Sequence, residues 1–405
     1  MNETVDPKTI LSSRVTQMAE SATLAMAAKA RELKSQGKDI ISLSLGEPDF
    51  KTPKHIQEAA KAAIDDGRFF SYPPVNGYLD LREAIVDKLK RDNGLNYHPN
   101  QVVVSTGAKQ SIANVMMALL EKGDEVVVFA PYWVSYAAII ELAEGIPVYI
   151  HGQLENQFKA TAEQLEAAIT PNTKAVLFSS PCNPTGGVFS REELQAIAGV
   201  LEKHPNIIAI ADEIYEHINF TGEHVSLASL PGMPDRTVTV NGFSKGYAMT
   251  GWRLGYIAAP EWIAKACNKV QGQITSGANS IAQRAAITAV SGDMAATHEM
   301  AKAYESRRNM VLEMLKEIPG VKTYEPQGAF YIFPDISEYF GKSDGQTTIN
   351  NSTDFCLYIL NEANVSLVTG EAFGAPHCMR LSFAASEAEL KAALGRMKAV
   401  LARLK

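Results

Sequence analysis

Two cationic side chains, Lys245 and Arg253, have the types and spacing to do chemistry together. Lys245 follows the β-rich run 237–240, and Arg253 lies eight residues further on, just before a second apolar run. A lysine that leaves a strand can form a Schiff base with an aldehyde, and an arginine can bind a phosphate through two parallel hydrogen bonds. Together they predict a seat for pyridoxal phosphate. Since most lysines are simply solvated at the surface, the prediction depends on the surrounding residues.

Further polar groups fall where strands are expected to end. Residues 105–109 close a strand and open a helix, whose first backbone N–H groups can bind a phosphate. Asn183 stands in a proline-containing turn and can present its amide to a phenolic oxygen. Asp212 follows the wholly apolar run 207–211, where a poorly solvated carboxylate needs a cationic partner such as a protonated pyridine nitrogen. The plain alternatives are a strand-to-helix turn, an Asn-Pro turn and a helix N-cap.

Trp133 adds an aromatic face on which a flat ring can stack, although a buried tryptophan is more often part of a core. In open α/β sheets, ligands collect at the carboxyl ends of the strands. All of these groups bear on one ligand at that place, so a shared site explains them better than unrelated structural roles do.

The elements that must position these groups alternate along the chain. Strand-like runs lie at 102–105, 125–129, 147–150, 175–179, 207–211, 237–240 and 254–259, and helical spacing fills much of the sequence between them. Short apolar strands separated by amphipathic helices are typical of a mostly parallel sheet covered on both faces. We therefore predict an α/β fold whose large domain contains a mostly parallel seven-stranded sheet.

The pattern changes after a helical stretch from about residue 262 to 318. Strand-like and helix-like runs then mix, at 330–333, 354–362, 379–383 and 387–404. This mixture indicates a smaller α+β part. We predict a large domain over residues 51–300 and a small domain formed by both chain ends, residues 1–50 and 301–405.

Composition and charge exclude several classes of protein. Of 405 residues, 46% are hydrophobic and 20% charged, which suffices for a large core, and the net charge of −7 disfavours a nucleic-acid-binding surface. The four cysteines lack metal-ligand spacing, so we expect reduced thiols and no metal site. Residues 1–6 are polar and acidic with no apolar segment behind them, and no apolar run approaches the ~20 residues of a membrane span. We expect a cytoplasmic protein that binds neither nucleic acid nor membrane.

Seven short motifs connect these observations to a known family. They read GEPDF (46–50), PYWVSY (131–136), NPTG (183–186), DEIYEH (212–217), SK (244–245), MTGWR (249–253) and RLS (380–382). On these motifs the chain resembles the fold type I pyridoxal-phosphate enzymes, specifically class I/II aminotransferases of the bacterial aspartate aminotransferase branch. The resemblance extends over essentially the whole chain, from Ser21 to the C-terminal helix.

The resemblance implies roles around the cofactor ring. Lys245, next to Ser244, would hold pyridoxal 5'-phosphate covalently and then act as general acid and base. Asp212 would pair with the pyridine N–H, which keeps the ring an electron sink. Asn183 and Tyr215 would hydrogen-bond the phenolic oxygen of the ring and tune its titration.

The resemblance also implies what holds the rest of the cofactor. Trp133 would stack on the ring, and Arg253 would bind the phosphate. Tyr72 matches a tyrosine that reaches the phosphate from the partner subunit, so a homodimer with shared active sites is implied. The phosphate would also be bound by three backbone amides, those of Gly107, Ala108 and Lys109.

The implied reaction moves the amino group of L-aspartate to 2-oxoglutarate, which gives oxaloacetate and L-glutamate. Arg380 would bind the substrate α-carboxylate as a bidentate pair, helped by the Gly46 backbone and beside Trp133 and Asn183. Lys109 would bind the distal carboxylate with help from Thr23. Relatives with the same lysine also accept prephenate, so a prephenate or broader aromatic aminotransferase is the alternative.

Two other classes of protein share parts of this pattern. A β- or γ-lyase on the same fold would keep Lys245 and Asp212, but the residues around Asn183 and Arg380 favour amino-group transfer. A cofactor-sensing transcription factor would need a DNA-binding module. The resemblance already begins near Arg14, which we expect to leave no room for one.

Overall fold

A seven-stranded sheet forms the centre of the computed structural model, which describes residues 10–18 and 21–405. The strand order is β2-β8-β7-β6-β5-β3-β4, and every neighbouring pair is parallel except the two that involve β8. The predicted mostly parallel sheet of seven strands is thus confirmed. The strands are β2 (Val102–Ser105), β3 (Glu125–Ala130), β4 (Ile146–His151), β5 (Thr173–Ser179), β6 (Ile208–Asp212), β7 (Thr237–Gly242) and β8 (Gly255–Ala258).

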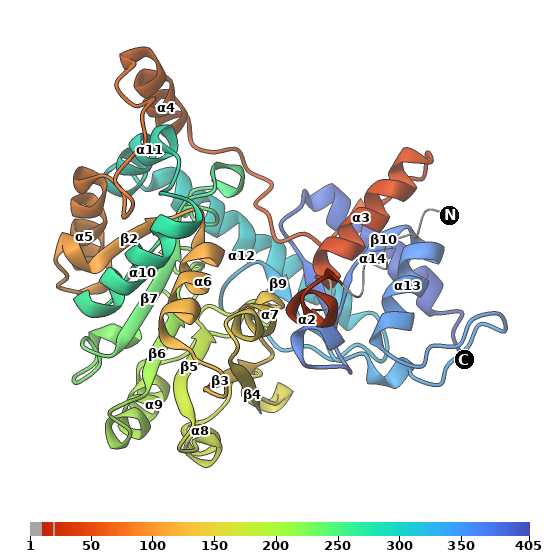
Figure 1. Ribbon diagram of the computed structural model, residues 1–405. Coiled ribbons are helices and arrows are strands. Elements are labelled where there is room, and N and C mark those ends of the chain that lie inside the picture. Colours follow the sequence, from red (N-terminus) through yellow and green to blue (C-terminus); the bar gives the residue numbers. More distant parts are fainter. Residues whose placement is uncertain (1–9, 19–20) are drawn as a thin grey trace, which may run out of the picture.

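Helices cover both faces of this sheet, and the alternation of side chains along each strand explains why both faces are apolar (Figure 1). Val103 of β2 packs with the cluster that contains Ile112 and Ile263, whereas Val104 packs on the opposite face with Leu89 and Ala285. The covering helices are α4 (Lys54–Asp66), α5 (Leu79–Asn93), α6 (Ala108–Leu119), α7 (Ser135–Leu142), α8 (Ala162–Ala168), α9 (Arg191–Lys203), α10 (Glu261–Ile274) and α11 (Ser280–Ser291).

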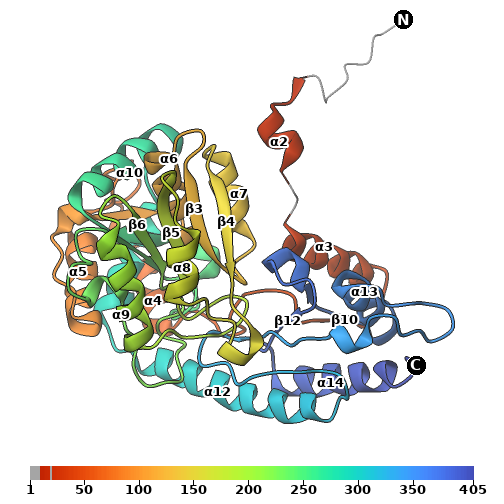
Figure 2. The ribbon, with the colours of Figure 1, turned by 90° about the horizontal axis from the view of Figure 1, so that it is seen from below.

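A second body brings the two parts of the chain outside the sheet together. Short strands pair there as β1 with β10 and as β11-β12-β9, and one apolar cluster joins Ile41 to Phe355 and Leu390. Figure 2 shows α12 running from the sheet to α14. The domain boundaries themselves stay a prediction. The elements are α3 (Ala22–Ser35), β1 (Ile41–Ser42), α12 (Ala295–Lys316), β9 (Tyr331–Ile332), α13 (Ser352–Ala363), β10 (Val365–Ser366), β11 (Val368–Thr369), β12 (Met379–Ser382) and α14 (Glu387–Leu401).

The helical pattern between residues 262 and 318 divides into three helices rather than one stretch. Gly277 has a φ of 119°, which an L side chain rarely adopts, and the Asn279 side chain accepts a hydrogen bond from the Ala282 backbone as an N-cap. A new helix, α11, therefore begins at that point. Near the N-terminus the short α2 (Ser13–Gln17) precedes α3 as a separate helix.

All four cysteines are free thiols, and three of them are buried. Within residues 10–18 and 21–405, no helix is both long and apolar enough to pass through a membrane.

Candidate active site

The predicted site residues meet at one edge of the sheet because their strands end there. Ser179 at the end of β5 is level with Asp212 at the end of β6, and Gly242 of β7 and Ser105 of β2 are both level with Gly255. β8 runs the opposite way, so the residues just before it, including Arg253, reach the same edge. The edge carries a pocket of about 600 Å³.

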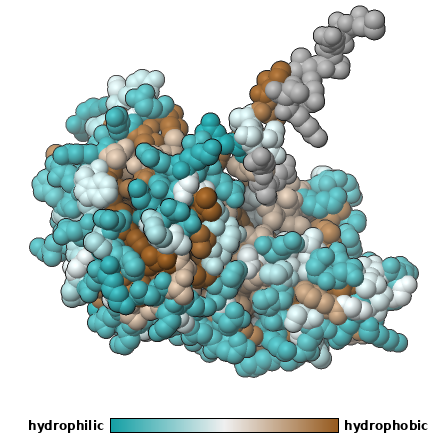
Figure 3. Space-filling model, turned by 60° about the horizontal axis from the view of Figure 1, so that its bottom comes forward, coloured by the Kyte–Doolittle hydropathy of each residue, from teal (hydrophilic) through white to brown (hydrophobic). Residues whose placement is uncertain are grey.

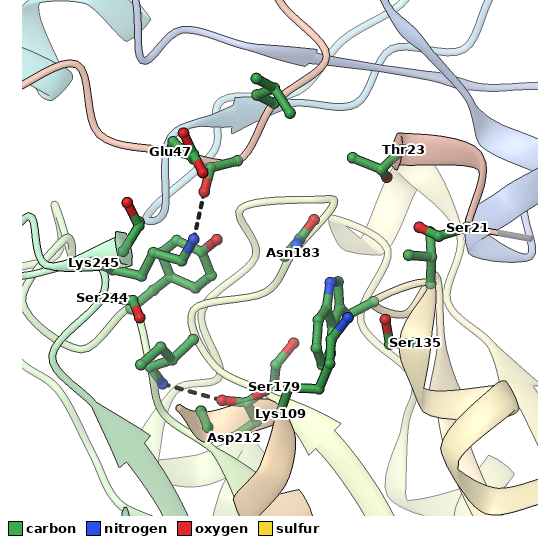
Figure 4. A pocket seen from close by; sticks show the side chains of 18 of the residues that line it. Ser21, Thr23, Glu47, Lys109, Ser135, Ser179, Asn183, Asp212, Ser244 and Lys245 are labelled. Carbon is green, nitrogen blue, oxygen red and sulfur yellow. Dashed lines mark hydrogen bonds between the residues drawn. The ribbon is translucent and has the colours of Figure 1, made fainter. Parts of the chain in front are cut away.

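The pocket collects nearly all of the residues singled out from the sequence (Figure 4). Gly107 lies directly under the Arg253 guanidinium rather than on the pocket wall. Tyr72 is 92% exposed and lies outside the pocket of its own chain. The predicted residues that line the pocket are Thr23, Gly46, Ala108, Lys109, Trp133, Asn183, Asp212, Tyr215, Ser244, Lys245, Arg253 and Arg380.

Lys245 is half-buried, and its amine is held between the two parts of the molecule. Its Nζ donates a hydrogen bond to the Gly46 carbonyl oxygen, as Figure 4 shows, and lies 5.6 Å from the centre of the Tyr215 ring. Burial lowers the pKa of Lys245 to about 8, although Glu47 opposes the shift. A substantial fraction of the amine is therefore neutral near that pH and able to act as a nucleophile or base.

Asp212 lies at the floor of the pocket as a carboxylate without an ion-pair partner. It accepts a hydrogen bond of 2.6 Å from the Tyr136 hydroxyl and one of 3.3 Å from the Ile214 backbone. Burial raises the pKa of Asp212 to about 6, and the Tyr136 hydrogen bond counteracts part of that rise. Within the described part of the chain, no lysine or arginine forms an ion pair with it. Such a carboxylate suits a cationic group on a bound ligand.

Arg380 is a buried cation, only 2% exposed, whose partners are neutral. It donates to the Asn183 side-chain oxygen at 2.9 Å and to the Ser44 carbonyl at 2.6 Å. Its guanidinium carbon lies 4.5 Å from the centre of the Tyr331 ring. Its Nε is buried without a hydrogen-bond partner among the described residues, and none of their carboxylates pairs with the guanidinium. An anionic group would complete this set of donors.

Gly107 and Arg253 form a second anion-binding corner at the N-terminus of α6. Gly107 has a φ of 85°, and a Cβ there would collide with the Arg253 guanidinium. The glycine thus lets the arginine lie against the start of α6. Of the three predicted amides, the Gly107 N–H donates to the Ser105 carbonyl at 2.8 Å. The N–H groups left for an anion are those of Ala108 and Lys109, which have no acceptor among the described residues. The Arg253 guanidinium also donates to the Thr250 carbonyl at 2.8 Å.

Lys109, in the first turn of α6, places a further cationic side chain in the pocket. Its Nζ lies 5.0 Å from the centre of the Trp133 ring. Burial lowers the pKa of Lys109, and the neighbouring Arg253 adds to that effect. The Thr23 hydroxyl oxygen is buried and makes no hydrogen bond to any described residue. The Lys109 amine and the Thr23 hydroxyl, which are far apart in the sequence, are thus both available to a ligand in the pocket.

Sequence reasoning missed four residues that complete the site: Glu47, Tyr136, Ser179 and Tyr331. Two of them had a usable signal. Glu47 and Tyr136 lie within the motifs at 46–50 and 131–136, and Tyr136 follows Trp133 by three residues. Ser179 and Tyr331 had none, because a serine that ends a strand and a tyrosine in an aromatic run look like ordinary structural residues.

Comparisons with known proteins agree with this geometry. The family described as aminotransferase class I and II matches residues 38–397. The chain is 47% identical over 402 residues to a bifunctional aspartate aminotransferase and glutamate/aspartate-prephenate aminotransferase of Petunia hybrida, covering 98% of this chain and 83% of that protein.

Two solved structures are also similar. An aspartate aminotransferase of Rhizobium meliloti has a TM-score of 0.94 at 43% identity, covering 98% of this chain and 99% of that one. An aspartate aminotransferase of Thermus thermophilus with maleate has a TM-score of 0.91 at 40% identity, covering 96% of this chain and 99% of that one.

Proposed function

Since this chain belongs to the class I and II aminotransferases, we propose that it transfers the amino group of L-aspartate to 2-oxoglutarate, giving oxaloacetate and L-glutamate. The observation that carries the choice of substrate is the pair of cations Arg380 and Lys109, which line one pocket without carboxylate partners among the described residues. Aspartate, glutamate and their oxo acids each bring two carboxylates. Two separated cations match that pattern.

We propose pyridoxal 5'-phosphate as the cofactor, because the chain supplies a fitting group for each of its parts. The half-buried amine of Lys245, with its lowered pKa, suits its aldehyde, the unpaired carboxylate of Asp212 suits its pyridine nitrogen, and the corner formed by Gly107 and Arg253 suits its phosphate. Trp133 offers its ring face, and Asn183 and Tyr215 offer donors to the phenolic oxygen. When bound, this cofactor withdraws electrons from the substrate Cα.

The chain's own residues bind the substrate and move its proton. Arg380 binds the α-carboxylate, and Lys109 with the Thr23 hydroxyl binds the distal one, so the Cα–H bond is oriented relative to Lys245. The lowered pKa of Lys245 lets its neutral amine take the proton from Cα as a base. The protonated amine can then donate that proton, as an acid, to a different atom of the bound substrate and cofactor. The aromatic rings of Trp133 and Tyr331 limit the access of water to this proton transfer.

Prephenate is a second candidate for the amino-group acceptor. The Petunia hybrida relative, whose name includes prephenate, is 47% identical to this chain. Prephenate carries two carboxylates, one of them beside its ketone, so it presents the same pattern to Arg380 and Lys109. We propose it as an additional acceptor rather than as a replacement for 2-oxoglutarate.

We further propose that the enzyme works as a homodimer in which Tyr72 enters the partner's site. Tyr72 is 92% exposed, and its neighbour Phe70 is 71% exposed. Exposed apolar side chains that lie together, rather than singly, mark interaction surfaces. Figure 3 shows apolar surface exposed on the body that contains the sheet. The exposed side chains of Phe70 and Tyr72 are available to a second copy of the chain.

The test is a panel of amino donors with purified, cofactor-loaded enzyme and 2-oxoglutarate. We expect kcat/KM for aspartate to exceed that for phenylalanine, tyrosine and alanine by at least about 10-fold, because only aspartate engages both cations. With glutamate as donor, prephenate should also be aminated. Lys245→Ala should lose both turnover and exchange of the Cα hydrogen with solvent. Aromatic donors that outperform aspartate would refute the assignment of substrate.

A further inference from the structure

Tyr331 touches both halves of the site, although nothing in the sequence singled it out. It lies on β9 of the second body, and its side chain is wholly buried. Its hydroxyl lies 2.7 Å from the Tyr215 hydroxyl, and its ring lies 4.5 Å from the Arg380 guanidinium carbon. One side chain therefore contacts the tyrosine on the cofactor side and the arginine on the carboxylate side.

Gly46 fixes where the Tyr331 hydroxyl can lie. A Cβ on residue 46 would collide with that hydroxyl oxygen, so the approach requires glycine. The carbonyl oxygen of the same glycine accepts the hydrogen bond from Lys245. The Tyr331 hydroxyl thus lies against Gly46, whose carbonyl binds Lys245, and beside the Tyr215 hydroxyl.

The hydrogen bond between the two tyrosines has a required direction. Each hydroxyl has a single proton, so one tyrosine donates and the other accepts. If Tyr215 donates to the phenolic oxygen of the cofactor, Tyr331 must donate to Tyr215. Burial raises the pKa of both hydroxyls, and the Arg380 cation counteracts the rise at both. Asp212 adds to the rise at Tyr215 only, which makes Tyr331 the better donor of the two.

We propose that Tyr331 is a positioning residue that directs the Tyr215 proton toward the cofactor and holds the Arg380 guanidinium in the plane that receives the α-carboxylate. This inference rests on the proposed function. Its consequence is a link between cofactor and substrate: the ring face of Tyr331 supports the arginine, and its hydroxyl supports the tyrosine. A donated hydrogen bond also polarises Tyr215 and strengthens its own donation.

Tyr331→Phe tests the hydroxyl, because it keeps the ring against Arg380. The readout is a pH titration of the absorbance of the bound cofactor. Loss of the hydroxyl weakens stabilisation of the phenolic anion, so the midpoint should move upward by a few tenths of a pH unit. Tyr215→Phe, which removes the donor itself, should move it further in the same direction. Tyr304→Phe, a buried tyrosine outside the pocket, should leave it unchanged.

The double variant Tyr215→Phe/Tyr331→Phe separates failure of this inference from failure of the proposed function. If Tyr331 acts through Tyr215, the double variant should titrate like Tyr215→Phe alone. An unchanged midpoint in Tyr331→Phe, or shifts that simply add, would overturn the positioning role. An unchanged midpoint in Tyr215→Phe would instead contradict the placement of the cofactor.

Tyr331→Leu tests the ring face, compared directly with Tyr331→Phe. The probe is maleate, an unreactive dicarboxylate, titrated into the cofactor-loaded enzyme. Loss of the aromatic face beside Arg380 should weaken maleate binding about 5-fold or more relative to Tyr331→Phe. Equal dissociation constants in the two variants would show that the ring does not hold the arginine.

Discussion

At the scale of single residues, the buried ionised carboxylate of Asp212 lowers the free energy of unfolding of the cofactor-free protein. Its folded-state pKa is raised from 3.8 to about 6, chiefly by burial, so folding takes up a proton between those values. Stability therefore falls as pH rises through this window, and the full penalty remains above it. The size of the shift corresponds to about 3 kcal/mol.

We therefore predict that Asp212→Asn stabilises the cofactor-free protein at pH 8 by up to about 3 kcal/mol while it removes turnover. The gain should vanish below about pH 4, where the aspartate is protonated in both states. Urea unfolding of both proteins at several pH values measures the difference. The exposed Asp235→Asn serves as the control and should show no such dependence. A variant that is less stable than the parent at pH 8 would contradict the account.

Lys109 is the residue to which we assign the choice of a dicarboxylic substrate, so its removal should be selective. Lys109→Met should lower kcat/KM for aspartate about 10–100-fold, the loss expected for a hydrogen bond to a charged group. Activity with phenylalanine should change little, because that donor has no distal carboxylate. Steady-state kinetics with both donors measure the split, with Lys203→Met, whose lysine pairs with Glu166 at the surface, as control. An equal loss for both donors would assign Lys109 to the cofactor instead.

The lowered pKa of Lys109 adds a dependence on pH. Although Lys109 is exposed as a residue, desolvation at the pocket wall lowers its pKa from the ordinary 10.5, so it loses its charge at a lower pH than a fully solvated lysine does. As the pH is raised, the affinity for dicarboxylates should accordingly begin to fall below pH 10.5, the ordinary pKa of a lysine. The same alkaline fall should be absent from Lys109→Met.

At the scale of elements, Gly107 at the start of α6 lets Arg253 form the corner proposed to bind the phosphate. Gly107→Ala adds a Cβ that collides with Arg253, at a φ of 85° that strains alanine. We predict that the affinity of the apo enzyme for pyridoxal phosphate falls by at least about 10-fold, since a charge-assisted pair is displaced. Titration of the apo enzyme by absorbance measures the dissociation constant.

A matched control for Gly107→Ala lies in α9. Gly199 has open space around its Cβ position and helical backbone, so Gly199→Ala should leave cofactor affinity unchanged and stabilise the fold by about 0.5–1 kcal/mol. Unchanged affinity in Gly107→Ala would show that the phosphate binds elsewhere.

Elements behind the site explain part of what the sequence could not predict. Lys88 on α5 looks like a solvated helix residue, yet it is buried and pairs with Glu216. The same carboxylate accepts hydrogen bonds from Asn93 at 2.9 Å and Asn241 at 2.8 Å. Glu216 thus ties α5 to β7 and to the segment that carries Tyr215. Periodicity places Lys88 on a helix, but only the packed structure shows that this face is covered.

At the scale of the whole molecule, the sequence predicted the strands of the sheet. It did not predict which residues of the second body complete the pocket. Each run of β-branched residues became a strand, and the groups that follow β5, β6 and β7 meet because parallel strands end at one edge. Arg380 and Tyr331 come from the second body, where a sequence pattern gives no distance to that edge. Arg380 was placed through the resemblance to a family, and Tyr331 was not placed at all.

The proposed homodimer with shared sites predicts that two defective variants can complement each other. On this proposal, Tyr72→Ala would weaken the cofactor site of the partner, whereas Lys245→Ala would disable its own site. When the two inactive or weakened variants exchange subunits, each hybrid dimer regains one intact site, so about a quarter of all sites recover after random reassortment. Assayed at limiting cofactor, the mixture should gain activity over the sum of the separate variants as subunits exchange. If no activity is gained although hybrids form, Tyr72 does not serve the partner's site.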